Sequence, residues 1–124
     1  MDRTSPSIQQ AIKTLEVEGI DRILIFSMYP QFSSTTTGAI YDAVNRAANG
    51  RRCPWFFDRK RQMPTLRFVP PYFDHPAYIE ALKQSITDET ERLPWKPDRH
   101  LITFHGIPKR YVDEGDPYRR QCEK

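Results

Sequence analysis

The apolar residues of this chain recur at two spacings, and each spacing predicts one type of element. Three stretches repeat at the spacing of one helix face, i, i+3, i+4 and i+7. They are Ile8, Ala11, Ile12 and Leu15; Ile40, Tyr41, Val44, Ala47 and Ala48; and Ile79, Leu82, Ile86 and Leu93. We therefore expect three amphipathic helices that bury these stripes.

Three shorter apolar runs, each following one of these helices, predict strands. Residues 23–26 form a continuous run, which is typical of a strand covered on both faces. Residues 66–69 form an alternating run, and residues 100–104 form the third. An alternation of helices and strands implies a parallel sheet with right-handed crossovers and helices on both faces. The expected fold class is α/β, an open parallel sheet in a single lobe over residues 1–124.

The helix ends carry the usual start and stop residues. Ser5 is expected to cap the first helix, and Gly19 is expected to end it. The hydroxyl-rich cluster at residues 33–37 should open the second helix. Asp74 or His75 can cap the third, because a proline that suits a first helical turn follows.

Loops that leave parallel strands at their carboxyl ends share one edge of the sheet, where open α/β folds bind ligands. Three such loops should meet there, at residues 29–36, 70–75 and 105–108. Most of the chemically unusual residues of the chain fall in these loops.

His105 is the foremost candidate for chemistry. It follows the run Leu101–Phe104 directly and precedes Gly106-Ile107-Pro108, a tight turn that fixes its direction. A neutral imidazole is a ligand for first-row divalent metals and can accept a proton. The alternative, a histidine that caps a helix or packs at the edge of the core, stays open on this pattern alone.

Other residues of the same edge suit a large planar ligand. Tyr29, Tyr72 and Phe73 would give it aromatic walls, although half-buried rings of ordinary packing would produce the same pattern. His75 could be a second metal ligand or a helix cap. His100, beside Arg99 at the start of the third strand, is expected to have no chemical role.

Composition limits the setting of this protein. Its 124 residues, 38% of them apolar, suit one small domain, and 11 prolines make it rich in loops. A net charge of +3 permits an anionic ligand without requiring nucleic acid. Cys53 and Cys122 form no Cys-x-x-Cys pair, so we expect a reducing, cytoplasmic setting. No run approaches the roughly 18 apolar residues of a membrane span.

Residues 51–61 interleave basic and aromatic side chains, as a contact for single-stranded nucleic acid would. We favour a solvated loop instead, because no Gly-x-x-Gly loop or other RNA-binding motif accompanies it. A binding domain without catalysis that uses residues 51–61 remains the alternative function.

Two segments of the chain carry long, specific motifs. Leu101–Tyr118, with its His-Gly-Ile-Pro and Gly-Asp-Pro-Tyr motifs, closely resembles the signature of the ferrochelatase family. Tyr29–Gly38 resembles a second segment of its bacterial and mitochondrial branches. The resemblance covers nearly the whole chain. It implies a Rossmann-like lobe of a chelatase fold and the insertion of ferrous iron into protoporphyrin IX to make haem.

The resemblance also implies roles for single residues. His105 would be the active-site histidine that binds the metal or takes pyrrole protons, and Tyr29 and Tyr72 would line the porphyrin cleft. Ferrous iron would be a substrate, and no tightly bound cofactor, nucleic-acid partner or transmembrane segment is expected. The longer protein could touch a membrane peripherally.

Members of this family are more than twice as long as this chain. The resemblance therefore implies an internal fragment of a two-lobed enzyme that is inactive by itself, with the partner glutamate of the metal site beyond residue 124. A related chelatase for another tetrapyrrole or metal remains a further alternative.

Overall fold

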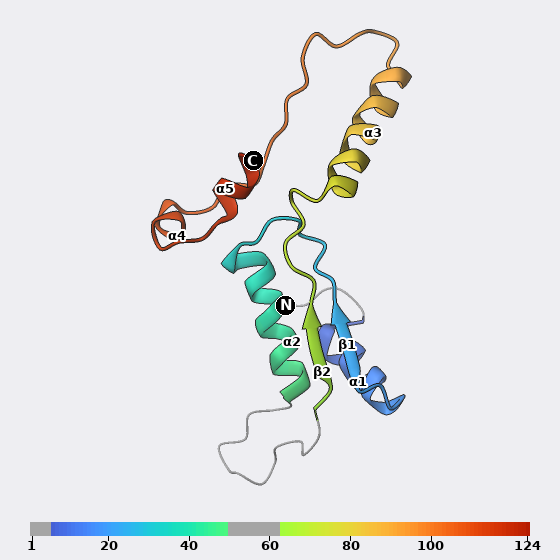
Figure 1. Cartoon of the computed structure of the whole chain (residues 1–124), viewed down its shortest axis with the longest axis vertical. Helices are drawn as coiled ribbons and strands as arrows, with labels where there is room; N and C mark the ends of the chain where they lie inside the picture. Colours follow the sequence, from blue (N-terminus) through green and yellow to red (C-terminus); the bar gives the residue numbers. More distant parts are fainter. Residues whose placement is uncertain (1–5, 50–62) are drawn as a thin grey trace. The chain divides into compact units, whose positions relative to one another are not determined.

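The computed structural model describes residues 6–49 and 63–124 (Figure 1). These residues fall into two compact units. Among the described residues, the first comprises 6–29, 34–49 and 63–70, and the second comprises 30–33 and 71–124. No described helix is long and apolar enough to cross a membrane.

The first helix, α1 (Ile8–Val17), begins at a reciprocal cap. The Ser7 hydroxyl accepts from the Gln10 backbone N–H at 3.2 Å, and the Gln10 side chain accepts from the Ser7 N–H at 2.9 Å. This capping box satisfies two backbone N–H groups at once. The cap is therefore Ser7, and the expected Ser5 lies outside the described residues. Gly19 ends the helix as predicted, with a φ of +75° that favours glycine.

The sheet of the first unit consists of β1 (Arg22–Ile25) and β2 (Thr65–Phe68), which pair in parallel. Ile23 lies opposite Leu66, and Ile25 lies opposite Phe68. The predicted parallel α/β arrangement is confirmed for these two strands.

The second helix begins with a π-helical turn, η1 (Ser34–Gly38), and continues as α2 (Ala39–Asn49). The hydroxyl-rich cluster thus opens the helix as predicted, with Thr37 only 2% exposed. The Tyr41 ring packs on Phe68 with a centroid distance of 4.2 Å. This contact joins α2 to β2.

The core of the first unit lies on one face of the sheet. Ile12 of α1 and Val44 and Ala48 of α2 are buried. The strand residues packed against them are Ile23, Ile25, Leu66 and Phe68. Leu24, on the opposite face, is 68% exposed. The first strand is therefore covered on one face only within this unit, because α1 and α2 contact each other and share that face. Helices on both faces stay a prediction.

In the second unit, α3 (Pro76–Arg92) is capped by His75, whose Nδ1 accepts from the Ala77 N–H at 3.2 Å. Its predicted apolar stripe is not buried: Ile79, Leu82 and Ile86 are 49%, 44% and 39% exposed. The periodicity of the sequence predicts an apolar face, but no element of the described second unit covers that face.

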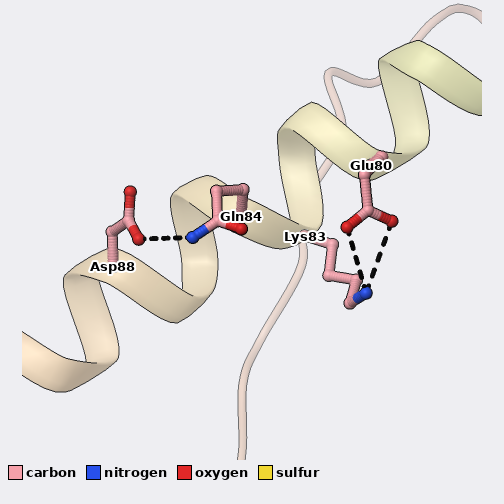
Figure 2. A network of polar contacts seen from close by, with 4 residues as sticks. All are labelled: Glu80, Lys83, Gln84 and Asp88. Carbon is pink, nitrogen blue, oxygen red and sulfur yellow. Dashed lines mark hydrogen bonds and ion pairs between the residues drawn. The ribbon is translucent and has the colours of Figure 1, made fainter.

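Figure 2 shows polar pairs along α3, with Lys83 3.1 Å from Glu80 and Gln84 2.6 Å from Asp88. Such exposed pairs add little stability.

The predicted third strand is not formed. Residues 100–108 contain neither helix nor strand, and Leu101 and Ile102 are 90% and 68% exposed. A strand needs a neighbour for its backbone N–H and C=O groups, and the described residues supply none here. The chain then forms α4 (Lys109–Asp113) and α5 (Tyr118–Cys122), where a partial helix was expected.

Candidate functional site

The turn that leads into α5 is built around Asp116. Gly115, at a φ of +100°, reverses the chain after α4. Oδ1 of Asp116 then accepts from the Tyr118 N–H at 3.0 Å, which closes the turn onto the first residue of α5. Its other oxygen, Oδ2, accepts from the Ser33 hydroxyl at 2.9 Å.

A second side chain of this region binds the same segment of the chain. Oε1 of Gln121 accepts from the Phe32 N–H at 2.7 Å. Ser33 beside it is 1% exposed, so its polar groups need partners inside the protein. Asp116 and Gln121 therefore hold Pro30–Ser33 against α5.

The loop before α3 reaches the same place within the second unit. The Tyr72 N–H donates to the Pro30 carbonyl at 3.0 Å. The Lys124 ammonium donates to Oδ2 of Asp74 at 2.7 Å and lies 5.4 Å from the centre of the Phe73 ring. This hydrogen bond is the main cause that lowers the pKa of Asp74.

His105 is exposed and lies between Phe104 and Gly106, outside any helix or strand. Its backbone hydrogen-bonds to the Tyr118 hydroxyl, which lowers the pKa of Tyr118. Burial and a hydrogen bond to Cys122 outweigh this effect, so the pKa of Tyr118 is raised overall. The main chain at His105 thus lies beside the Tyr118 hydroxyl, at the first residue of α5.

The predicted convergence of three loops holds for their parts within the second unit. Segments 30–33 and 71–74 and the backbone of His105 all contact residues 116–124. They do so around α5, whereas a shared edge of the sheet was expected.

The structure places the two candidate tyrosines differently. Tyr72 is half-buried, and its ring meets that of Tyr78 edge-on at 5.4 Å. Burial and, secondarily, the charge of Tyr78 raise the pKa of Tyr72. Tyr29 belongs to the first unit, where its side chain is half-exposed and its N–H donates to Ser27 Oγ at 3.3 Å.

The other two histidines have local partners. His75 uses its Nδ1 as the cap of α3, which supports the cap over the second metal ligand. Nε2 of His100 lies 3.0 Å from the Thr90 hydroxyl.

Across residues 6–49 and 63–124, no three His, Cys, Asp or Glu side chains gather closely enough to hold a metal ion. The basic segment 51–61 lies outside the described residues.

Reasoning from the sequence missed Asp116, Gln121 and Tyr118 as parts of this site. One signal was present: aspartate before proline in Gly115-Asp116-Pro117 favours a turn closed by its own side chain. Nothing local indicated that Asp116 and Gln121 would bind a segment more than 80 residues earlier, at separations of 83 and 89 residues.

Comparison with known proteins identifies the family of this chain. A sequence model of the ferrochelatase family matches residues 1–124. The chain belongs to the ferrochelatase family. It is 45% identical over 118 residues to the ferrochelatase of Bradyrhizobium diazoefficiens, and this match covers 95% of this chain and 32% of that protein. The ferrochelatase of Francisella tularensis subsp. novicida is 39% identical over 120 residues, covering 97% of this chain and 33% of that protein.

The resemblance seen in residues 101–118 is thereby confirmed at the level of the family. The chain spans about a third of the length of the curated ferrochelatases that it matches.

Proposed function

We propose that this chain supplies the histidine-bearing part of a ferrochelatase, which inserts ferrous iron into protoporphyrin IX to make haem. The observation that carries the proposal is the match of the ferrochelatase family to all 124 residues. The contacts of the His105 backbone, segment 30–33 and segment 71–74 with residues 116–124 support it, because they gather the expected site loops.

In the proposed mechanism, His105 accepts a pyrrole proton or binds the incoming iron. The free porphyrin carries two N–H protons, and both must leave as Fe²⁺ forms its bonds to the four nitrogens. A base within hydrogen-bond reach of the ring centre makes this loss easier. The exposed His105 side chain is accessible to a ligand of this size.

Tyr29 and Tyr72 are proposed to hold the plane of the porphyrin. Aromatic side chains offer flat, apolar surfaces to such a ring. Holding the ring bent would turn the nitrogen lone pairs toward the metal, which is strain in the direction of the transition state. Iron is a substrate in this scheme, and we propose no resident cofactor.

We propose that residues 1–124 do not catalyse the reaction alone. The support for this is coverage, because the chain spans about a third of the length of the curated ferrochelatases that it matches. The cytoplasmic setting also stays part of the proposal, and it rests on the two isolated cysteines.

A chimeric protein tests the proposal. In it, residues 1–124 replace the matched third of the Bradyrhizobium diazoefficiens ferrochelatase. Anaerobic loss of protoporphyrin fluorescence with Fe²⁺ measures turnover. We expect turnover by the chimeric protein and none by the 124-residue chain.

His105→Ala in the chimeric protein should lower kcat by about 10²–10⁴-fold, the usual contribution of a general base. His100→Ala is the matched control, because His100 is exposed and bonds only locally to Thr90 among the contacts described. A folded chimeric protein without turnover, or full activity of His105→Ala, would overturn the proposal.

A further inference from the structure

Residues 116–124 contact three separate parts of the second unit. Each contact comes from a different side chain. The pairs are Asp116 with the Ser33 hydroxyl, Gln121 with the Phe32 N–H, Lys124 with the Asp74 carboxylate, and the Tyr118 hydroxyl with the backbone of His105. This short segment therefore connects loops that are remote in sequence.

We propose that Asp116 and Gln121 are positioning residues of the ferrochelatase site. They fix the main chain of Pro30–Ser33 relative to the segment that carries His105. This inference rests on the proposed function for its catalytic consequence, and on the contacts alone for its structural part.

Gln121 acts on the main chain itself. Its 2.7 Å bond is to a backbone N–H, so it restrains the course of the chain and not merely one side chain. Phe32 lies three residues after Tyr29, the proposed porphyrin contact. Loss of the Gln121 acceptor would leave a partly buried N–H without this partner, which favours a shift of the loop.

Asp116 uses both carboxylate oxygens, and this sets the geometry more tightly than one bond would. Oδ1 holds the start of α5 through Tyr118, and Oδ2 holds the buried Ser33. One side chain thus couples the direction of α5 to the position of the loop.

Tyr118 connects this arrangement to His105. Tyr118 is the residue whose N–H binds Asp116, and its hydroxyl lies beside the backbone of His105. A displacement of α5 would therefore change the surroundings of the His105 main chain. Misplacement of a reacting group by about 1 Å can cost about a hundredfold in rate.

Gln121→Leu and Gln121→Glu separate positioning from general stability. Leucine has a similar size but no acceptor, whereas glutamate keeps an oxygen for the Phe32 N–H. The matched control is Gln84→Leu on α3, where the lost bond is the exposed 2.6 Å contact with Asp88 (Figure 2). Asp116→Asn is a milder second variant, because asparagine keeps one acceptor for the Tyr118 N–H.

The first readout needs neither iron nor porphyrin. Backbone and imidazole NMR signals of His105 are followed in the 124-residue chain. Gln121→Leu should shift both, Gln121→Glu should restore them, and Gln84→Leu should leave them unchanged. If Gln121→Leu unfolds the second unit, Asp116→Asn should still shift the His105 signals.

The second readout is steady-state kinetics of the chimeric protein. Gln121→Leu should lower kcat by about a hundredfold, with KM for protoporphyrin within about threefold, and Gln121→Glu should recover most of the loss. Unchanged His105 signals, or failure of Gln121→Glu to rescue, would overturn the inference. Absence of turnover in the unsubstituted chimeric protein would instead count against the proposed function, while the NMR result still decides the structural part.

Discussion

At the scale of single residues, the ion pair of Asp74 and Lys124 predicts how the stability of the second unit changes at low pH. The hydrogen bond from Lys124 holds the pKa of Asp74 below its ordinary value. Because the folded pKa lies below the unfolded one, the stabilisation is fully present above the unfolded pKa of about 4. It is lost as the pH falls through the folded pKa.

Lys124→Met should therefore raise the pKa of Asp74 toward its ordinary value, which carboxyl NMR titration measures. Lys109→Met is the control, since it removes a lysine whose 2.7 Å partner is Asp113. Equal Asp74 titrations in the two variants would contradict this account.

Cys122 gives a prediction about reactivity. Burial, the largest cause, raises the pKa of its thiol, and the Tyr118 hydrogen bond acts in the opposite direction. Since the thiolate is the reactive form, Cys122 should be alkylated more slowly at neutral pH than a fully exposed cysteine of ordinary pKa. Tyr118→Phe should slow it further.

Iodoacetamide rates from pH 7 to 10, in a Cys53→Ser background, check this expectation. Faster alkylation after Tyr118→Phe at every pH would show that the hydroxyl shields the thiol more than it stabilises the thiolate.

Single-residue roles were predictable where the partner is local. His75 could be recognised as a cap because its partner, Ala77, is two residues away and Pro76 marks the first turn. Asp116 and Gln121 could not be recognised, because their partners follow from how the chain returns on itself and not from any short pattern.

At the scale of elements, the capping box of α1 makes a stability prediction. Ser7→Ala should lower the free energy of unfolding of α1 by about 0.5–2 kcal/mol, since it removes the acceptor of the Gln10 N–H. Ser85→Ala, in the exposed middle of α3, is the matched control and should be neutral or slightly stabilising. Thermal unfolding by circular dichroism and amide exchange of α1 measure both. Equal destabilisation by the two variants would contradict the stabilising role of the Ser7 cap.

The packing of α1 on α2 makes a second prediction. Ile12 is 5% exposed among Val44 and Ala48 of α2. Ile12→Ala should cost about 2–5 kcal/mol in unfolding free energy, because it opens a cavity in a small core.

Val17→Ala, at an 80% exposed position of the same helix, should stay within about 0.5 kcal/mol of the unsubstituted chain. Urea denaturation of the two variants decides this. A cost for Ile12→Ala below 1 kcal/mol would mean that the core of the first unit is not as described.

The elements that pack on one another within the first unit were predicted well. The α2 stripe and the alternation of β2 follow from packing on β1 and α1 in the first unit. The α3 stripe and the run at residues 100–104 have the same sequence patterns but stay exposed. The sequence pattern of an element predicts which of its faces can be buried. Whether that face is buried depends on another element that packs against it.

At the scale of the whole molecule, the exposed run can be compared with the family. The chain spans about a third of its curated relatives, and the segment before His105 exposes Leu101, Ile102 and Phe104 at 90%, 68% and 52%. An apolar run of this kind is typical of a strand in a larger sheet. We expect it to gain a strand partner at full family length.

Amide hydrogen exchange measures this gain. Residues 101–104 should exchange freely in the 124-residue chain and be protected on the order of a hundredfold or more in the chimeric protein, because a paired strand opens only by local unfolding. The amides of Leu66 and Phe68 in β2 are the control, since that strand is already paired and should be protected in both proteins. Because His105 directly follows this run, pairing would also fix the direction of its imidazole in the proposed porphyrin site. An active chimeric protein in which residues 101–104 still exchange freely would show that the site needs no such strand.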